Sequence, residues 1–327
     1  MAMLAGAAPR LTSVVARPGS DADALYARGR EHAVRAAGFT SEPGLNLRFY
    51  GGRTIEQLTF THIYLGGKAS WSSEDVAAID RSLPAALTDP HLENVIAQYF
   101  ADEKPTTTFA PSRVLEEPCP ARVYRDTVEA FAAALEASNV LSGFDLASSV
   151  FCFMLPPGVV LVDGDSTGRQ SHSLELHERG EAVDSKHGLG GYHGSVHPKH
   201  GAQTETVYYA VGVYSEGDNG IAAFPHPWES VCATFYHEVN EARTDPDVED
   251  AIRAGDGPSA DRFLGWYSPR GGEIGDIPME EAGADLSEVM KVVPLANGGT
   301  APVQLMWSNA VGGPEGPIAA PHPAAAR

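Results

Sequence analysis

The sequence predicts an α/β fold, in which strands and helices follow one another along the chain. Two observations support it: short apolar segments that end at glycine or proline, and longer segments with apolar residues at helical spacing. Their alternation is typical of a sheet covered by helices. The chain has 327 residues, of which 43% are hydrophobic, so its apolar material suffices for one large domain or two modest ones.

Strands are expected where apolar residues are dense. The segments 45–50 and 58–65 each end at a Gly-Gly pair, which interrupts a strand. The continuous apolar run at 149–155 is typical of a strand buried on both faces. A further strand is expected at 206–214.

Helices are expected where good helix formers carry an apolar stripe. The first should begin at Ser72 or Ser73, which are both favourable N-cap residues. It should end at Pro84, because proline lacks the N–H group that a helix interior uses. Further helices are expected at about 91–101, 124–137 and 229–242.

The domain organisation follows from composition. We expect a loosely ordered arm at 1–40, with a short helix near 22–37, followed by an α/β domain at 41–243. An irregular C-terminal subdomain at 244–311 should complete the candidate site described below, and a disordered tail should follow at 312–327. Within the α/β domain, the polar, glycine-rich segment 163–203 holds half of the histidines and is expected to be a long functional or disordered loop.

The charge balance limits the possible partners. Lysine and arginine number 23 and aspartate and glutamate 43, which gives a net charge of −20. This argues against nucleic acid and membranes as partners, because both attract basic surfaces, and it favours a cation. Three cysteines can form at most one disulfide, so the fold does not depend on a disulfide framework, and the lack of a CxxC pair argues against a cysteine-based zinc site. The absence of a clear signal peptide predicts a cytoplasmic protein.

The most specific motif is His237-Glu238-Val239-Asn240-Glu241, in the expected helix 229–242. Residues four apart share a helix face, so His237 and Glu241 can chelate one ion from a face that we expect to border a cleft. Glu238 would then lie where it can take a proton from a water molecule. The spacing is that of the zincin HExxH helix with glutamate as the second ligand, which Zn²⁺ accepts.

A third ligand must come from elsewhere, and three candidates remain open. Glu273 or Asp276 could complete the site, and Asp276 could instead hydrogen-bond a ligand. His193 is the other candidate; with Tyr192 it could also stabilise an oxyanion. Zn²⁺ is the expected cofactor, and Ca²⁺, which prefers oxygen ligands only, is less expected.

Several segments resemble the EXORDIUM-like (phosphate-induced protein) family of plants and its fungal and bacterial relatives. The most specific are the HExxEAxTDP segment at 237–246, Gly265-Trp266-Tyr267, and the EIGD segment at 273–276. The resemblance covers about residues 45–312. The chain has Ile277-Pro278 where family members commonly have a cysteine just after the EIGD segment.

The resemblance implies a zincin-like mixed sheet with an active-site helix, and it carries over the site residues His237, Glu238, Glu241, Asp245, Glu273 and Asp276. It also implies an extracellular protein. The first hypothesis is therefore a zinc-dependent hydrolase, metallopeptidase-like, that acts on a peptide.

A second hypothesis is a non-catalytic binding protein with a degenerate metal site. Its partner would be a glycan or a protein, bound by the aromatic residues Trp266, Tyr267 and Trp307, which we expect to be exposed. A His/Glu pair four residues apart is also compatible with a solvated surface pair that binds nothing. Donor atoms that converge on one point would favour a bound metal, and donor atoms that lie far apart would favour the binding protein.

Overall fold

The computed structural model describes residues 13–15, 39–100, 104–167, 183–200, 203–255, 257–283 and 285–327 of the chain. The helix expected near 22–37 lies outside the described residues, as does most of the 1–40 arm. Within that arm, residues 13–15 form a strand at the edge of the central sheet.

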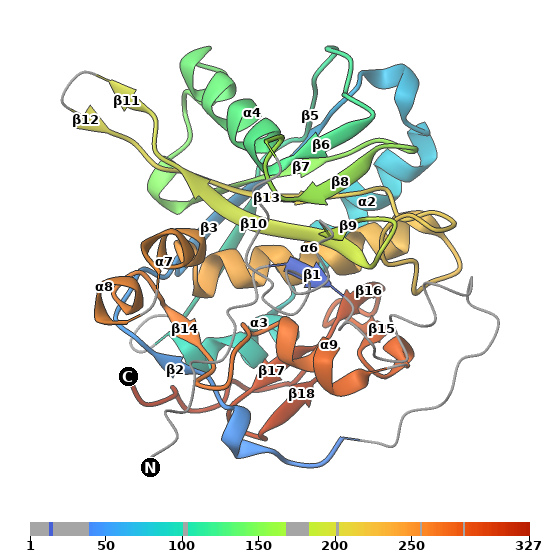
Figure 1. Cartoon of the computed structure of the whole chain (residues 1–327). Coiled ribbons are helices and arrows are strands. Elements are labelled where there is room, and N and C mark those ends of the chain that lie inside the picture. The colour runs from blue at the N-terminus through green and yellow to red at the C-terminus, as the bar shows by residue number, and fades with distance from the viewer. Residues whose placement is uncertain are drawn as a thin grey trace.

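A mixed seven-stranded sheet forms the centre of the fold (Figure 1). In spatial order its strands are β1 (Ser13–Val15), β10 (Leu189–Val196), β13 (Val207–Gly212), β7 (Ser149–Met154), β3 (Gln57–Tyr64) and β4 (Thr106–Phe109), with β5 (Arg113–Val114) also paired to β3. From β13 to β4 and β5 all pairs are parallel, whereas β10 is antiparallel to both of its neighbours. The predicted α/β fold is confirmed.

Helices cover both faces of this sheet. On one face lie α2 (Ser73–Leu87) and α6 (Pro227–Thr244); on the other lie α4 (Arg125–Ala137) and a small sheet of β6 (Arg122–Tyr124), β8 (Val160–Asp163) and β9 (Val183–Asp184). In β7, Val150 and Cys152 pack in the first core, whereas Phe151 and Phe153 pack in the second. A strand covered on both faces is apolar throughout, as predicted for 149–155.

The remaining elements are short, and several of them lie across α6 from the sheet. The strand pairs are β2 (Arg48–Phe49) with β14 (Trp266–Tyr267), β15 (Met290–Pro294) with β16 (Thr300–Gln304), β17 (Met306–Ser308) with β18 (Gly313–Glu315), and β11 (Lys199–His200) with β12 (Gln203–Thr204). The helices are α3 (Pro90–Ile96), α7 (Val248–Ala254), α8 (Pro258–Asp261) and α9 (Asp276–Ala282), with 3-10 turns at Pro43–Leu45, Lys68–Ser70, Ala97–Tyr99, Leu146–Ser148 and Leu286–Glu288.

Helix α2 begins as predicted but ends later. The Ser72 hydroxyl caps it by accepting a hydrogen bond from the Asp75 N–H. The helix continues through Pro84 to Leu87, so the predicted end at Pro84 is wrong. One proline removes one backbone bond, and the last turn is held because both the N–H and the hydroxyl of Thr88 donate to the Pro84 carbonyl.

Strand β10 was not predicted, because its sequence LGGYHGSV lies in the segment 163–203 that was expected to be a loop. Every residue of β10 is buried in the central sheet. Its glycines allow close packing: a Cβ atom on Gly191 would lie 2.5 Å from the Val211 carbonyl oxygen and 3.1 Å from Cγ2 of Thr234 on α6. The glycine at position 191 therefore fits a place where both the neighbouring strand and α6 come close to the backbone. Residues 168–182 of the same segment lie outside the described residues.

The chain from residue 312 onward, predicted to be a disordered tail, is described to its end and begins with a strand. β18 pairs with β17, and the Ile318 N–H donates to the His91 carbonyl at 2.9 Å. Near the end, the Ala325 N–H donates to the Gln98 carbonyl. These hydrogen bonds fix the backbone of residues 312–327 against α3 and the 3-10 turn that follows α3, although this segment contains few apolar residues.

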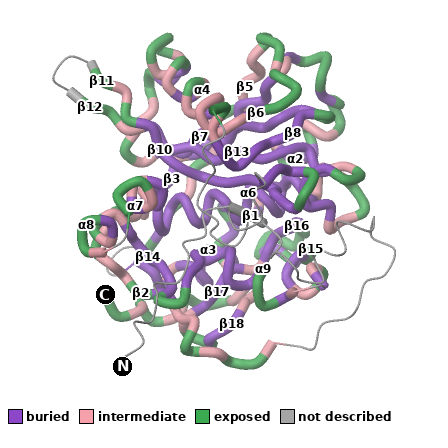
Figure 2. Tube along the Cα trace, in the orientation of Figure 1, coloured by how far each residue is buried: buried purple, intermediate pink, exposed green. Residues whose placement is uncertain are grey.

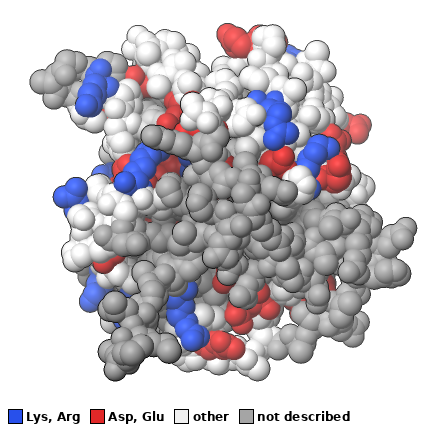
Figure 3. Space-filling view, viewed as in Figure 1, with Lys and Arg blue, Asp and Glu red and all other residues white. Residues whose placement is uncertain are grey.

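The visible surface carries mixed charge. In Figure 3, Lys and Arg atoms lie among Asp and Glu atoms of the described residues and do not gather in one basic patch. Among the described residues, no helix combines the length and the apolar character that a membrane span requires.

The close packing of β10 is testable. We expect Gly191→Ala to lower the free energy of unfolding by about 1–3 kcal/mol, because the added methyl group meets a backbone carbonyl that cannot move freely. Gly44→Ala is the control, since a Cβ atom there has no neighbour within 4 Å. Urea unfolding measures both variants; equal stability would contradict the steric role of Gly191.

Candidate metal centre

His237 and Glu241 lie one turn apart on α6, as the motif predicted. Nε2 of His237 and Oε2 of Glu241 are 2.9 Å apart, and neither side chain is exposed. The face of the helix that was expected to border a cleft is enclosed by protein instead. Residues 230–244 are all buried, because α6 packs against the central sheet and against β16 (Figure 2). The candidate site therefore lies in the interior.

Glu273 and Asp276 reach the site from the loop before α9 and from the first residue of that helix. A Cβ atom on Gly275 would lie 2.5 Å from Nδ1 of His237, so the approach of this loop to α6 requires glycine. The N–H groups of Gly275 and Asp276 donate to Oε1 of Glu241 at 3.0 and 3.1 Å. These bonds hold one oxygen of Glu241 and leave Oε2 beside His237.

Gln304, the last residue of β16, orients the His237 ring. Its Nε2 donates to the Gly275 carbonyl at 2.7 Å, and its Oε1 lies 2.9 Å from Nδ1 of His237. Because this amide oxygen can only accept, Nδ1 carries a proton, and Nε2 is the ring nitrogen that faces Glu241. Metal-binding histidines are typically oriented in this way. Gln304 was not predicted as a site residue, since no local pattern connects it with His237.

The structure also brings His193 of β10 to the site. Nδ1 of His193 lies 3.5 Å from Oε2 of Glu238 and 3.6 Å from Oε2 of Glu241. Its Nε2 lies 3.5 Å from Oε1 of Glu273 and 3.3 Å from the Asp245 carbonyl oxygen, to which it can donate. Nδ1 has no hydrogen-bond partner among the described residues and is therefore available to a cation.

Tyr192, in contrast, is not brought to the site. Neighbouring residues of a strand point to opposite faces, so its ring lies in the core between the sheet and α4. The Arg125 guanidinium stacks over it at 4.2 Å from the ring centroid, and the Tyr209 ring is 6.3 Å away. The predicted oxyanion contact of Tyr192 does not agree with this position.

The donor atoms form two groups that share Glu241. One group is His237, Glu241 and Asp276, and the other is His193, Glu241 and Glu273. In each group, one donor atom from every residue lies within 4.8 Å of the others. Bonds to zinc are about 2.0–2.2 Å long, so donors around one ion are about 3–4 Å apart. The distance of 3.8 Å from Nε2 of His237 to Oδ1 of Asp276 fits this range.

Burial makes the charge of this cluster costly. Glu241, Glu273 and Asp276 form no ion pair with lysine or arginine in the described part of the chain. Burial, and then the nearby Glu241 carboxylate, raise the pKa of Glu273 and of Asp276 well above their usual range. Burial acts in the same direction on Glu241, but His237, His193 and the Gly275 N–H together outweigh it and lower the pKa of that carboxyl. A divalent cation would offset the remaining repulsion.

The aromatic residues that were expected to be exposed are core residues, so this prediction is wrong. Trp266, Tyr267 and Trp307 are 1%, 4% and 1% exposed. The indole N–H of Trp266 donates to the Tyr99 carbonyl at 2.8 Å. A partner-binding surface made of these three rings is therefore excluded.

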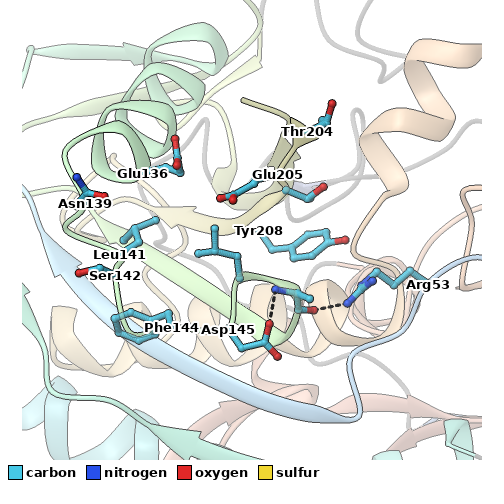
Figure 4. A pocket seen from close by; sticks show the side chains of 13 residues that line it. Arg53, Glu136, Asn139, Leu141, Ser142, Phe144, Asp145, Thr204, Glu205 and Tyr208 are labelled. Carbon is cyan, nitrogen blue, oxygen red and sulfur yellow. Dashed lines mark hydrogen bonds between the residues drawn. The ribbon is translucent and has the colours of Figure 1, made fainter. Parts of the chain in front are cut away.

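A pocket of about 590 Å³ lies elsewhere on the molecule (Figure 4). Arg53, Glu136, Phe144 and Tyr208 are among its lining residues, and none of the candidate metal ligands is. The Arg53 guanidinium donates to the Ala147 carbonyl and lies over the Tyr208 ring. This pocket is thus separate from the buried donor groups.

Comparisons with known proteins add little to this geometry. No family model and no curated protein matches the chain. The crystal structure of metalloproteinase-II from Bacteroides fragilis is similar over 70% of this chain, with 14% sequence identity and a TM-score of 0.26. The chain spans about half (52%) of that protein's length. A similarity at this level carries no argument, and the resemblance to the EXORDIUM-like family stays a prediction.

The role of Gln304 can be measured directly. We expect Gln304→Met to weaken metal binding about 10–100-fold, because the His237 ring loses the acceptor that orients it. Gln98→Met is a matched control: Gln98 is equally buried, but it hydrogen-bonds to Val95, Ser308 and Ala310 instead. Zinc titration by calorimetry compares the two; similar affinities would contradict an orienting role for Gln304.

Proposed function

We propose that this protein is a zinc-dependent hydrolase with a zincin-like active-site helix, and that it cleaves peptide bonds. The observation that carries the proposal is the convergence of Nε2 of His237, Oε2 of Glu241 and Oδ1 of Asp276. One imidazole and two carboxylates form a suitable donor set for catalytic zinc, and they leave a position open.

The chain holds each of these donors in place. Gln304 orients His237, and two backbone N–H groups hold the second oxygen of Glu241. The other carboxylate oxygen of Asp276 accepts a hydrogen bond from the Glu273 N–H at 3.1 Å, which leaves Oδ1 for the ion. A zinc ion bound there supplies a Lewis acid that lowers the pKa of water from ~15.7 toward ~7.

Glu238 is the proposed general base. It follows the first ligand on α6, and its Oε2 lies 3.5 Å from Nδ1 of His193. Glu238 would hold the proton removed from the attacking water and return it to the leaving amine.

A second candidate function is favoured by the enclosure of the site. Each of His237, Glu241 and Asp276 is at most 3% exposed, which suits an ion that stabilises the fold without catalysis. In that case the protein would bind a partner through a surface other than the buried aromatic residues.

Substitution of the base distinguishes the two functions. We expect Glu238→Gln to bind zinc as the wild type does and to lower the rate of peptide hydrolysis about 10²–10⁴-fold. Glu229→Gln, on the first turn of the same helix, should keep full activity, because glutamine can also accept the His226 N–H. Elemental analysis and a peptide-library assay give the two readouts. A zinc-free protein, or a Glu238→Gln variant of unchanged activity, would refute the hydrolase.

Metal removal should destabilise the protein under either function. At free zinc about 100-fold above its dissociation constant, binding contributes about 2.7 kcal/mol, or roughly 4 °C in Tm for a chain of this length. Differential scanning fluorimetry with and without a chelator measures this shift. A stabilised, zinc-loaded protein that hydrolyses no peptide would support the second candidate, and an unchanged Tm would argue against any tightly bound ion.

A further inference from the structure

We propose that the centre holds two divalent cations, with Glu241 between them. The inference rests on the proposed function for the first cation, held by His237, Glu241 and Asp276. The second cation would be held by His193, Glu241 and Glu273, which come from β10, α6 and the loop before α9.

The second donor set has free donor atoms that are fully enclosed. Nδ1 of His193 and both carboxylate oxygens of Glu273 lack a hydrogen-bond partner among the described residues, and both side chains are 0% exposed. Unpaired polar atoms are rare in protein interiors because each costs about 1–3 kcal/mol. Nδ1 of His193 also lies near the shared carboxylate, 3.6 Å from Oε2 of Glu241. A cation in this set would give a partner to one ring nitrogen of His193 and to one carboxylate oxygen of Glu273.

Glu241 is placed to serve both cations. Its Oε1 is held by the two backbone N–H groups at the start of α9. Its Oε2 lies 2.9 Å from Nε2 of His237 and 3.6 Å from Nδ1 of His193, so the same oxygen faces both imidazoles. In hydrolases with two metals the ions are typically about 3.5–4 Å apart, a separation that a shared carboxylate can span.

The charge of the cluster also favours a second cation. The ligand carboxylates of Glu241, Glu273 and Asp276 carry three negative charges when ionised, and one divalent cation leaves one of these charges uncompensated in the interior. Two divalent cations supply four positive charges, and the buried carboxylates of Glu238 and Asp245 add two negative charges to the three of the ligands. Glu238 lies beside the second set, 3.5 Å from Nδ1 of His193.

The stoichiometry of the full-length wild-type protein tests the proposal first. After chelation and titration with Zn²⁺, we expect about two equivalents per chain, and Mn²⁺-loaded protein should give the electron paramagnetic resonance spectrum of a spin-coupled pair. One equivalent and an uncoupled Mn²⁺ spectrum would overturn the second site and leave the single-zinc proposal intact. Absence of any bound metal would overturn both.

Variants then assign the second site. Glu273→Gln should bind about one equivalent, lose the spin coupling and retain a folded protein, and His193→Asn is the second variant if Glu273→Gln does not fold. Glu93→Gln is the control, because Glu93 is a largely buried glutamate that hydrogen-bonds to Thr107 away from the cluster. It should keep two equivalents. A folded Glu273→Gln or His193→Asn variant that still binds two equivalents would refute the assignment.

Discussion

The burial of carboxylates beside two histidines is the constraint on which the rest of the centre depends. Glu238, Glu241 and Glu273 are fully enclosed, and like charges at short range repel one another strongly in such an environment. Folding therefore requires protons or cations at this place. The imidazoles of His193 and His237 make cations the better solution, because they add neutral nitrogen donors to the oxygen set.

Helix α6 can hold this cluster because it is packed on all sides. The loop before α9 approaches it through Gly275 at a distance that a Cβ atom would prevent, and the sheet packs closely on it at Gly191, where a Cβ atom would lie 3.1 Å from Cγ2 of Thr234. Gln304 then closes the arrangement by bonding both to that loop and to His237. The rigidity that orients the donors thus comes from tertiary packing on both sides of the helix.

The same packing encloses the site. A hydrolase needs a route by which the substrate reaches the metal, whereas a structural ion needs none. The pocket beside Arg53 provides no such route, since no candidate ligand lines it. The chemistry of the donor atoms favours a catalytic zinc ion, whereas their burial favours an ion that stabilises the fold. Measurements of peptide hydrolysis and of thermal stability together distinguish the hydrolase from the binding protein.

Local spacing was sufficient to predict the helix that carries His237 and Glu241 on one face and the buried strand at 149–154, because periodicities of 3.6 and 2 are properties of neighbouring residues. Local spacing does not predict which distant groups join them. The glycine-rich segment around His193 forms a central strand, Gln304 lies beside the His237 ring, and the tryptophans that were expected to be exposed are buried. These outcomes depend on contacts between residues far apart in the chain, which no local pattern records.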